Sequence, residues 1–210
     1  MWLPQLPRLA SENAALHGRL AAEQVELAQL REILRHAKQT QQLLQTAKSS
    51  SSVVASVIGR AVIPTQHVII LDKGAHDKVA VNSIVVSAEG VVGRVFEVHP
   101  TTSLAMLLSD PDSRASCLVE RSRESGLLQG TGGGAYQLIY LDLDADIAVH
   151  DRIVTAGLGG PFPKGLVVGT VTRVIRDERT ASVWAIVQPA VKLRQLEEVI
   201  CLPPPSSSSD

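Results

Sequence analysis

The chain has 210 residues, of which 45% are hydrophobic but only 3% aromatic, so valine, leucine and isoleucine must fill its core. Twenty lysines and arginines oppose 21 aspartates and glutamates, and the formal net charge of −1 argues against binding to nucleic acid or strongly to a membrane surface. The two cysteines, Cys117 and Cys201, form no metal-like cluster, and we expect free core thiols, with a bridge between them left open.

Leucine recurs at heptad spacing through the first 48 residues. Eight of the twelve a and d positions between residues 6 and 44 are leucine, and so narrow a stripe needs a partner helix. Asn13 at an a position favours a parallel, in-register pair, because it can then face its own copy. Packing of the helix on its own β region is the alternative. We expect a homodimer whose seam is formed by Leu6, Leu9, Asn13, Leu16, Leu20, Leu27, Leu30, Leu34 and Leu44.

After a serine joint at residues 49–52, the sequence changes to short runs of valine, isoleucine and threonine that are bounded by turn residues. This pattern predicts a mainly β protein with two small β-barrel domains behind the coiled-coil helix. We assign residues 53–134 to the first barrel and 135–202 to the second, with strand 53–63 belonging to either, and expect a disordered tail over 203–210. The predicted strands lie near 54–63, 67–72, 83–87, 90–98, 103–108, 114–120, 125–129, 136–141, 152–155, 166–175, 182–188 and 197–202.

The β region contains two similar passes. Residues 71–95 and 141–171 share a Leu-Asp pair, then an apolar run, then a Gly-Val-Val-Gly-like segment. The offset grows from 70 to 76 residues, which indicates an insertion in the second pass near 157–163. Both duplication and recurrent hairpin patterns explain the similarity.

Several segments only mimic functional motifs. Asp142, Asp144 and Asp146 open like a calcium loop, but isoleucine stands where its glycine and glutamate belong, so a solvated turn explains them better. Residues 130–134 are glycine-rich without the lysine and helix of a phosphate loop, and we interpret them as a flexible crossing between the two β modules. The six histidines show no ligand spacing. We therefore expect no catalytic residue, metal or cofactor, although a triad assembled in space is an alternative.

The rigid loop 161–165 holds Phe162, one of only two phenylalanines. An exposed ring there would be a candidate anchor for a partner. The alternative is that the ring plugs the end of a barrel.

An ordered set of stretches over about 55–202 resembles the MreC family, the rod shape-determining proteins of bacteria. The most specific is 154–160 running into 162–169; the others are 71–74, 90–95, 110–114, 126–132, 144–147, 189–190 and 196–199. Two departures are Lys78 and His150, which stand where the family tends to have glycine. Both lie in predicted turns, so they question the local turn type.

The resemblance implies a non-enzymatic scaffold of the cell-elongation machinery, anchored in the inner membrane with its bulk in the periplasm. Family members dimerise through the coil, some form filaments, and they bind the elongation-specific penicillin-binding transpeptidase and the membrane protein MreD. No apolar run here approaches the ~18 residues of a membrane-spanning helix, so we expect either a soluble cytoplasmic protein or a chain that begins just past its anchor. A periplasmic adaptor of an export system and a β-barrel hydrolase are the competing functions.

The coiled-coil prediction can be tested by sedimentation. The intact chain should self-associate, whereas a version starting at Val53 should not. Leu27→Glu should weaken the dimer because it places a charge in the seam, and should leave the β domains folded. Equal monomeric behaviour of the two chains would contradict the seam, and global unfolding of Leu27→Glu by circular dichroism would contradict two separable modules.

Overall fold

A computed structural model describes residues 52–63, 66–177 and 182–204. The predicted coiled coil and its seam residues lie outside this part, as do most of the serine joint and of the C-terminal tail. Residues 50–210 belong to one compact unit, which contains every strand described below.

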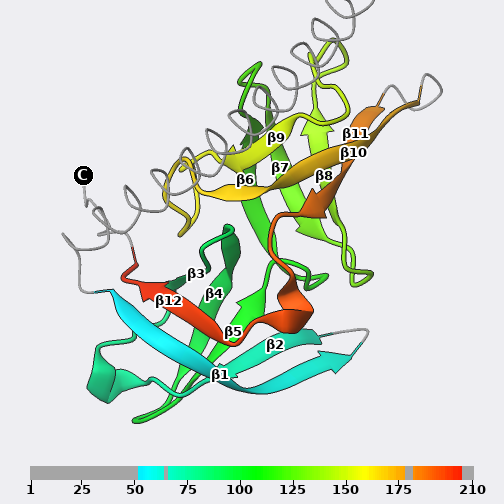
Figure 1. Ribbon diagram of the computed structural model, residues 1–210. Helices are drawn as coiled ribbons and strands as arrows, with labels where there is room; N and C mark the ends of the chain where they lie inside the picture. The colour runs from blue at the N-terminus through cyan, green and yellow to red at the C-terminus, as the bar shows by residue number, and fades with distance from the viewer. Residues whose placement is uncertain (1–51, 64–65, 178–181, 205–210) are drawn as a thin grey trace, which may run out of the picture. The chain divides into compact units, whose positions relative to one another are not determined.

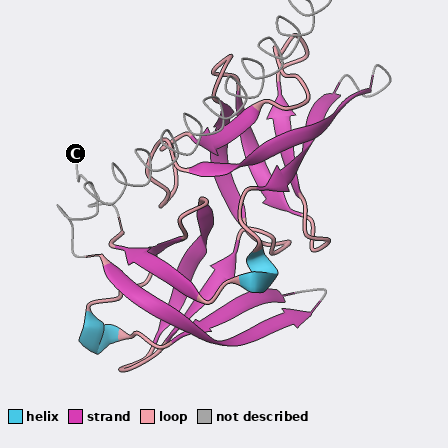
Figure 2. Ribbon diagram, in the orientation of Figure 1, coloured by secondary structure: helices cyan, strands magenta, loops and turns pink. Residues whose placement is uncertain are grey.

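The described residues form twelve strands, in close agreement with the predicted ones (Figure 1). The described helical segments are two short 3₁₀ turns, η1 (Ala75–Asp77) and η2 (Leu193–Gln195), as Figure 2 shows. The strands are β1 (Val53–Ile63), β2 (Gln66–Leu71), β3 (Ile84–Val86), β4 (Val91–Val98), β5 (Ser103–Leu107), β6 (Arg114–Val119), β7 (Ser125–Gly130), β8 (Tyr136–Leu141), β9 (Arg152–Thr155), β10 (Val167–Asp177), β11 (Ser182–Pro189) and β12 (Glu198–Leu202).

The strands close into two antiparallel barrels, as the sequence predicted. The first has the cyclic order β1-β12-β3-β4-β5-β2 and the second β10-β11-β8-β7-β6-β9. Closure pairs every strand on both sides, which removes the exposed edges that make open sheets prone to aggregation.

The predicted boundary at 134/135 is wrong. Strands β6 and β7 belong to the second barrel, and β12, the last strand of the chain, belongs to the first. The predicted assignment took each barrel to be one continuous stretch, whereas the second barrel is inserted between β5 and β12 of the first. The sequence assigns strand 53–63 to either barrel; as β1 it pairs with β12 and β2 in the first.

The two barrels have the same topology. Matching β1, β2, β3, β4, β5 and β12 to β7, β8, β9, β10, β11 and β6 converts the first cyclic order into the second. The repeated sequence passes thus lie on equivalent strands. Strand β6 opens the second barrel, whereas its counterpart β12 comes last in the first.

The irregularities of the strands repeat as well. The pairing of β4 with β5 shifts between Val95 and Glu97, and the pairing of β10 with β11 shifts between Val171 and Arg173, 76 positions further along in both cases. A β-bulge inserts an extra residue and bends the strand locally, so both barrels bend at the same point. The repeat is therefore one of backbone geometry as well as of apolar pattern.

The predicted insertion also lies in this repeat. Val86 of β3 pairs with Val91 of β4 across residues 87–90, whereas Val154 of β9 pairs with Val167 of β10 across the longer segment 155–166. The extra residues therefore belong to one hairpin loop of the second barrel.

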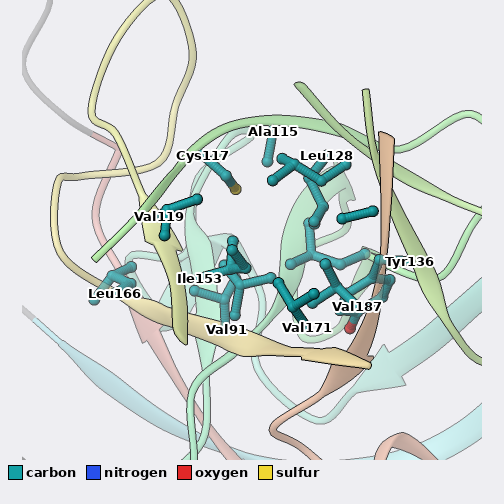
Figure 3. Close-up of a cluster of buried hydrophobic side chains, with 14 of the residues drawn as sticks. Val91, Ala115, Cys117, Val119, Leu128, Tyr136, Ile153, Leu166, Val171 and Val187 are labelled. Atoms are coloured by element: carbon teal, nitrogen blue, oxygen red, sulfur yellow. The ribbon is translucent and has the colours of Figure 1, made fainter. Parts of the chain in front are cut away.

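Each barrel has its own apolar cluster, and one cluster extends across both. Ile84, Val86 and Val91 of the first barrel belong to the cluster that fills the second, and Figure 3 shows Val91 among its side chains. The first barrel is filled by a separate set that includes Ile69 and Leu71. The β3–β4 hairpin is thus packed against the core of the second barrel.

Both cysteines are free and buried, as predicted. Burial raises the pKa of the Cys117 thiol to about 12 and, together with the nearby charge of Asp72, that of Cys201 to about 12. Neither thiol carries an appreciable thiolate fraction near neutral pH, so neither is suited to nucleophilic chemistry.

Two equivalent glycines allow close approach of neighbouring backbone. A Cβ on Gly93 would lie 1.9 Å from the Met106 carbonyl oxygen, and one on Gly169 would lie 2.1 Å from the Gln188 carbonyl oxygen. We predict that Gly93→Ala and Gly169→Ala each lower the free energy of unfolding by more than about 2 kcal/mol in urea denaturation. Gly160→Ala is the control, because nothing lies within 4 Å of its Cβ position. Equal stability of all three variants would contradict the close strand packing.

Candidate partner-binding surface

The second barrel presents an aromatic side chain to solvent at the end of β8. Tyr140 is 78% exposed, and Leu143 in the following turn is 60% exposed. We call these two residues the β8 surface. Tyrosine is enriched among the side chains that carry most of the binding energy at protein interfaces.

The backbone at Tyr140 explains its exposure. Leu138 of β8 pairs with Ala185 of β11 and Leu141 pairs with Val183, so residues 139 and 140 lie opposite Trp184 alone. Tyr140 adopts a left-handed conformation with φ of 59°, which is uncommon for a residue other than glycine. Such a bulge redirects side chains, and here it accompanies a tyrosine that faces outward.

The turn that follows Tyr140 is held by an arginine from β10. The Arg176 guanidinium donates hydrogen bonds to the carbonyl oxygens of Leu143 at 3.0 Å and Ala145 at 2.9 Å. These bonds fix the backbone that carries Leu143. Because few degrees of freedom are lost when a partner binds a fixed surface, binding there costs less conformational entropy.

A second arginine ties the same turn to the segment before β9. Arg121 donates to the Asp146 carboxylate at 2.6 and 2.8 Å and to the Asp151 carboxylate at 2.9 and 3.0 Å. Its hydrogen bonds hold the pKa of both carboxyl groups below the ordinary value, and the acids in turn raise the pKa of Arg121. Asp146 therefore forms an ion pair with Arg121. No group of three or more metal-ligating side chains occurs among the described residues.

Phe162 is placed differently from the β8 surface. Its ring is only 4% exposed and belongs to the apolar cluster of the second barrel. Thr155 holds the surrounding loop, because its hydroxyl donates to the Pro163 carbonyl oxygen at 2.5 Å and accepts from the Leu166 N–H at 2.9 Å. A partner anchor at Phe162 would need an exposed ring. The burial of the ring therefore excludes Phe162 as an exposed anchor and agrees with the alternative that it plugs the end of a barrel.

The glycine-rich segment 130–134 also lies elsewhere than predicted. It is the turn between β7 and β8, within the second barrel, and not a crossing between the two barrels. Gly132 donates its N–H to the Ser109 carbonyl oxygen at 3.1 Å, and the Thr131 hydroxyl donates to the Ala135 carbonyl oxygen at 2.8 Å. The error followed from the misplaced barrel boundary.

One histidine does meet a serine. His67 Nδ1 lies 2.8 Å from the Ser109 hydroxyl, and both residues are buried. The neighbouring Asp110 carboxylate accepts from the His67 backbone N–H at 2.7 Å and from the Asp112 N–H at 2.8 Å. In a catalytic triad the acid would orient the imidazole ring. Here the acid orients backbone, so these three residues do not form that arrangement.

The fold and these sites can be compared with known proteins. The family model described as "Rod shape-determining protein MreC, barrel core" matches residues 57–203. The chain belongs to the MreC family. It is 30% identical to the cell shape-determining protein MreC of Escherichia coli over 93% of this chain, and 28% identical to that of Listeria monocytogenes over 91%. The alignments cover 54% and 68% of those proteins, so the chain spans about half of the first.

Solved MreC structures share the two-barrel fold. The crystal structure of MreC from Pseudomonas aeruginosa superposes with a TM-score of 0.69 at 33% identity, covering 72% of this chain and 98% of that one. A more distant neighbour is the complex between the penicillin-binding protein PBP2 and MreC from Helicobacter pylori, with a TM-score of 0.57 at 17% identity over 72% and 97% of the two chains. In the part of the chain that the structure describes, no helix has the length and hydropathy needed to span a membrane.

The two departures from the MreC pattern have a common explanation. Lys78 and His150, at positions where the family tends to have glycine, adopt left-handed conformations with φ of 68° and 74°. Glycine populates this region without steric cost, whereas other residues do so rarely. The left-handed turn geometry is therefore kept, and Lys78 and His150 adopt it with a steric strain that glycine would not have.

The sequence did not single out the β8 surface. Tyr140 occupies a strand with alternating apolar residues, and such a pattern does not show where a bulge turns a side chain outward. A detectable signal is that Tyr140 precedes the acidic turn 142–146, since a strand that ends in a polar turn exposes its last residues.

The ion pairs of Arg121 should make part of the stability pH-dependent. Because the folded-state pKa values of Asp146 and Asp151 are lowered, their contribution is complete above the ordinary carboxyl pKa and is lost as the pH falls through the lowered values. Arg121→Ala should raise both pKa values in a carboxyl NMR titration and flatten the acid loss of stability. Arg173→Ala, at an exposed site on β10, is the control. Unchanged titration in Arg121→Ala would contradict the ion-pair assignment.

Proposed function

We propose that this protein is a non-enzymatic scaffold of the bacterial cell-elongation machinery, which maintains rod shape by self-associating and by binding and activating the elongation-specific penicillin-binding transpeptidase. The observation that carries this proposal is the match to the MreC barrel core over residues 57–203. The complex of the Helicobacter pylori relative with a penicillin-binding protein supports the class of partner.

The chemistry of the described site fits a scaffold. Among the described residues, both cysteine thiols are buried, and no acid orients the His67 ring beside Ser109. The exposed Tyr140 side chain precedes a turn that is held by hydrogen bonds. A scaffold needs only surfaces that bind one conformation of the partner more tightly than another, and such differential binding is sufficient to activate an enzyme. We propose that the β8 surface, Tyr140 and Leu143, contributes to this contact.

The remaining parts of the proposal concern assembly. We propose a parallel homodimer through residues 1–48, further association into filaments, contact with MreD, and a location in the periplasm with an anchor in the inner membrane through an N-terminal helix. Two distant structural neighbours, each the major periplasmic domain of the cell shape-determining filament MreC, support the periplasmic location and the filaments.

Binding should be measured between the full chain and the extracytoplasmic part of the elongation transpeptidase of the same organism. We expect saturable binding, and we expect Tyr140→Ala combined with Leu143→Ala to weaken it by at least about tenfold, because truncation of interface anchors costs about 2 kcal/mol or more. Leu158→Ala is the matched control, since Leu158 is 66% exposed on another loop of the same barrel.

The outcomes separate the two parts of the proposal. Absence of any binding by the unaltered chain would overturn the transpeptidase as partner. Intact binding by the Tyr140 and Leu143 variant would overturn the β8 surface alone, and equal weakening by Leu158→Ala would show that the loss is not specific to that surface.

A further inference from the structure

A cavity of about 610 Å³ lies among the β1–β2 region, the end of β5, the 130–134 turn and the segment that joins β11 to β12. Its size is within the range of about 300–1,000 Å³ that is common for ligand pockets. Residues from both barrels and from the connecting segment line it, whereas the β8 surface does not.

The charged residues that line this cavity are all basic. Arg60, Lys192 and Arg194 line it together with His67, and no aspartate or glutamate does. None of the three cations takes part in an ion pair among the described residues. Two carboxylates contact the backbone of lining residues: Asp110 accepts from the His67 N–H at 2.7 Å, and Glu89 accepts from the Lys192 N–H at 3.3 Å. A pocket with several unneutralised cations favours an anionic ligand.

Arg60 is held in place by backbone. Its guanidinium donates hydrogen bonds to the carbonyl oxygens of Leu193, at 2.6 Å, and Leu196. Neutral carbonyls satisfy part of the guanidinium without cancelling its charge, so Arg60 both fixes the β11–β12 connection and leaves a positive charge at the cavity. A fixed guanidinium is well suited to the planar geometry of a carboxylate.

His67 adds a buried polar group to the same cavity. Its side chain is 6% exposed, and Nδ1 is occupied by the Ser109 hydroxyl at 2.8 Å. The other ring nitrogen, Nε2, has no hydrogen-bond partner among residues 52–63, 66–177 and 182–204. Nε2 is not among the fully buried unpartnered atoms, so it stays open to solvent at the cavity and is available to a ligand atom.

The remaining lining is largely aliphatic, from Leu107, Pro189, Val191 and Leu193. An apolar wall with basic groups suits a ligand that has both a negative charge and an aliphatic body. We propose that this cavity binds a carboxylate-bearing peptide segment, with acidic groups at Arg60, Lys192 and Arg194 and neighbouring aliphatic side chains against the apolar wall. This site goes beyond the proposed scaffold function and does not depend on the β8 surface.

The proposal is tested by NMR titration of the full chain with a blocked hexapeptide that alternates leucine and glutamate. We expect saturable shifts of amides that line the cavity, such as those of Gly132, Gly134 and Gln195. A peptide that alternates leucine and glutamine should bind at least about tenfold more weakly. Glutarate and inorganic phosphate, titrated separately, show whether a free carboxylate or any small anion suffices.

Charge-reversal variants connect the binding to the cavity. Lys192→Glu combined with Arg194→Glu should weaken the acidic peptide by at least about tenfold. Lys164→Glu combined with Arg173→Glu is the matched control, because it changes the net charge equally at exposed positions outside the lining. Dispersed amide spectra of both variants establish that they fold.

Several results would overturn the proposal. They are the absence of saturable shifts up to roughly 10 mM peptide, shifts that map away from the cavity, equal affinity for the neutral peptide, and equal loss in the two charge-reversal variants. Affinity for glutarate or phosphate equal to that for the acidic peptide would also overturn it, since a peptide segment would then hold no advantage over a small anion.

Discussion

Closure of the first barrel by the last strand is the constraint on which the other features depend. Strand β12 fills the gap between β1 and β3, so one edge of each of these strands finds its hydrogen-bond partners only when the end of the chain has returned. Without β12 the first barrel would expose two strand edges, each a template for unwanted pairing. The same return draws the β11–β12 connection across the first barrel, where Val191 and Leu196 join its apolar cluster and Arg60 binds two of its carbonyls.

The strands could be predicted from the sequence because their cause is local. Runs of valine and isoleucine bounded by turn residues favour extended backbone wherever they occur, and the predicted strands follow the observed ones closely. Barrel membership has a cause that is not local. The contribution of β12 to the first barrel depends on pairing with residues almost 150 positions away in the sequence, such as Val53 with Cys201, and no short pattern encodes that pairing.

The same distinction between local and long-range causes applies to the candidate site residues. The apolar character of Tyr140 and Phe162 is visible in the sequence, but their exposure depends on a bulge in one case and on core packing in the other. The His67–Ser109 contact joins residues from separate strands and loops, so spacing along the chain gave no sign of it. The repeated sequence passes, in contrast, correctly indicated equivalent strands. The equivalent bulges at Val95 and Val171 show that similar local sequences bend the two barrels in the same way.

The position of β12 also has a consequence for synthesis. A chain is made from its N-terminus, and domains tend to fold as units while later residues are still being added. All six strands of the second barrel are continuous in the sequence, from Arg114 to Pro189, so that barrel can form as soon as its own residues have emerged. The first barrel, although five of its strands are made earlier, must wait for the final one. The barrel that begins first on the ribosome is therefore the one completed last.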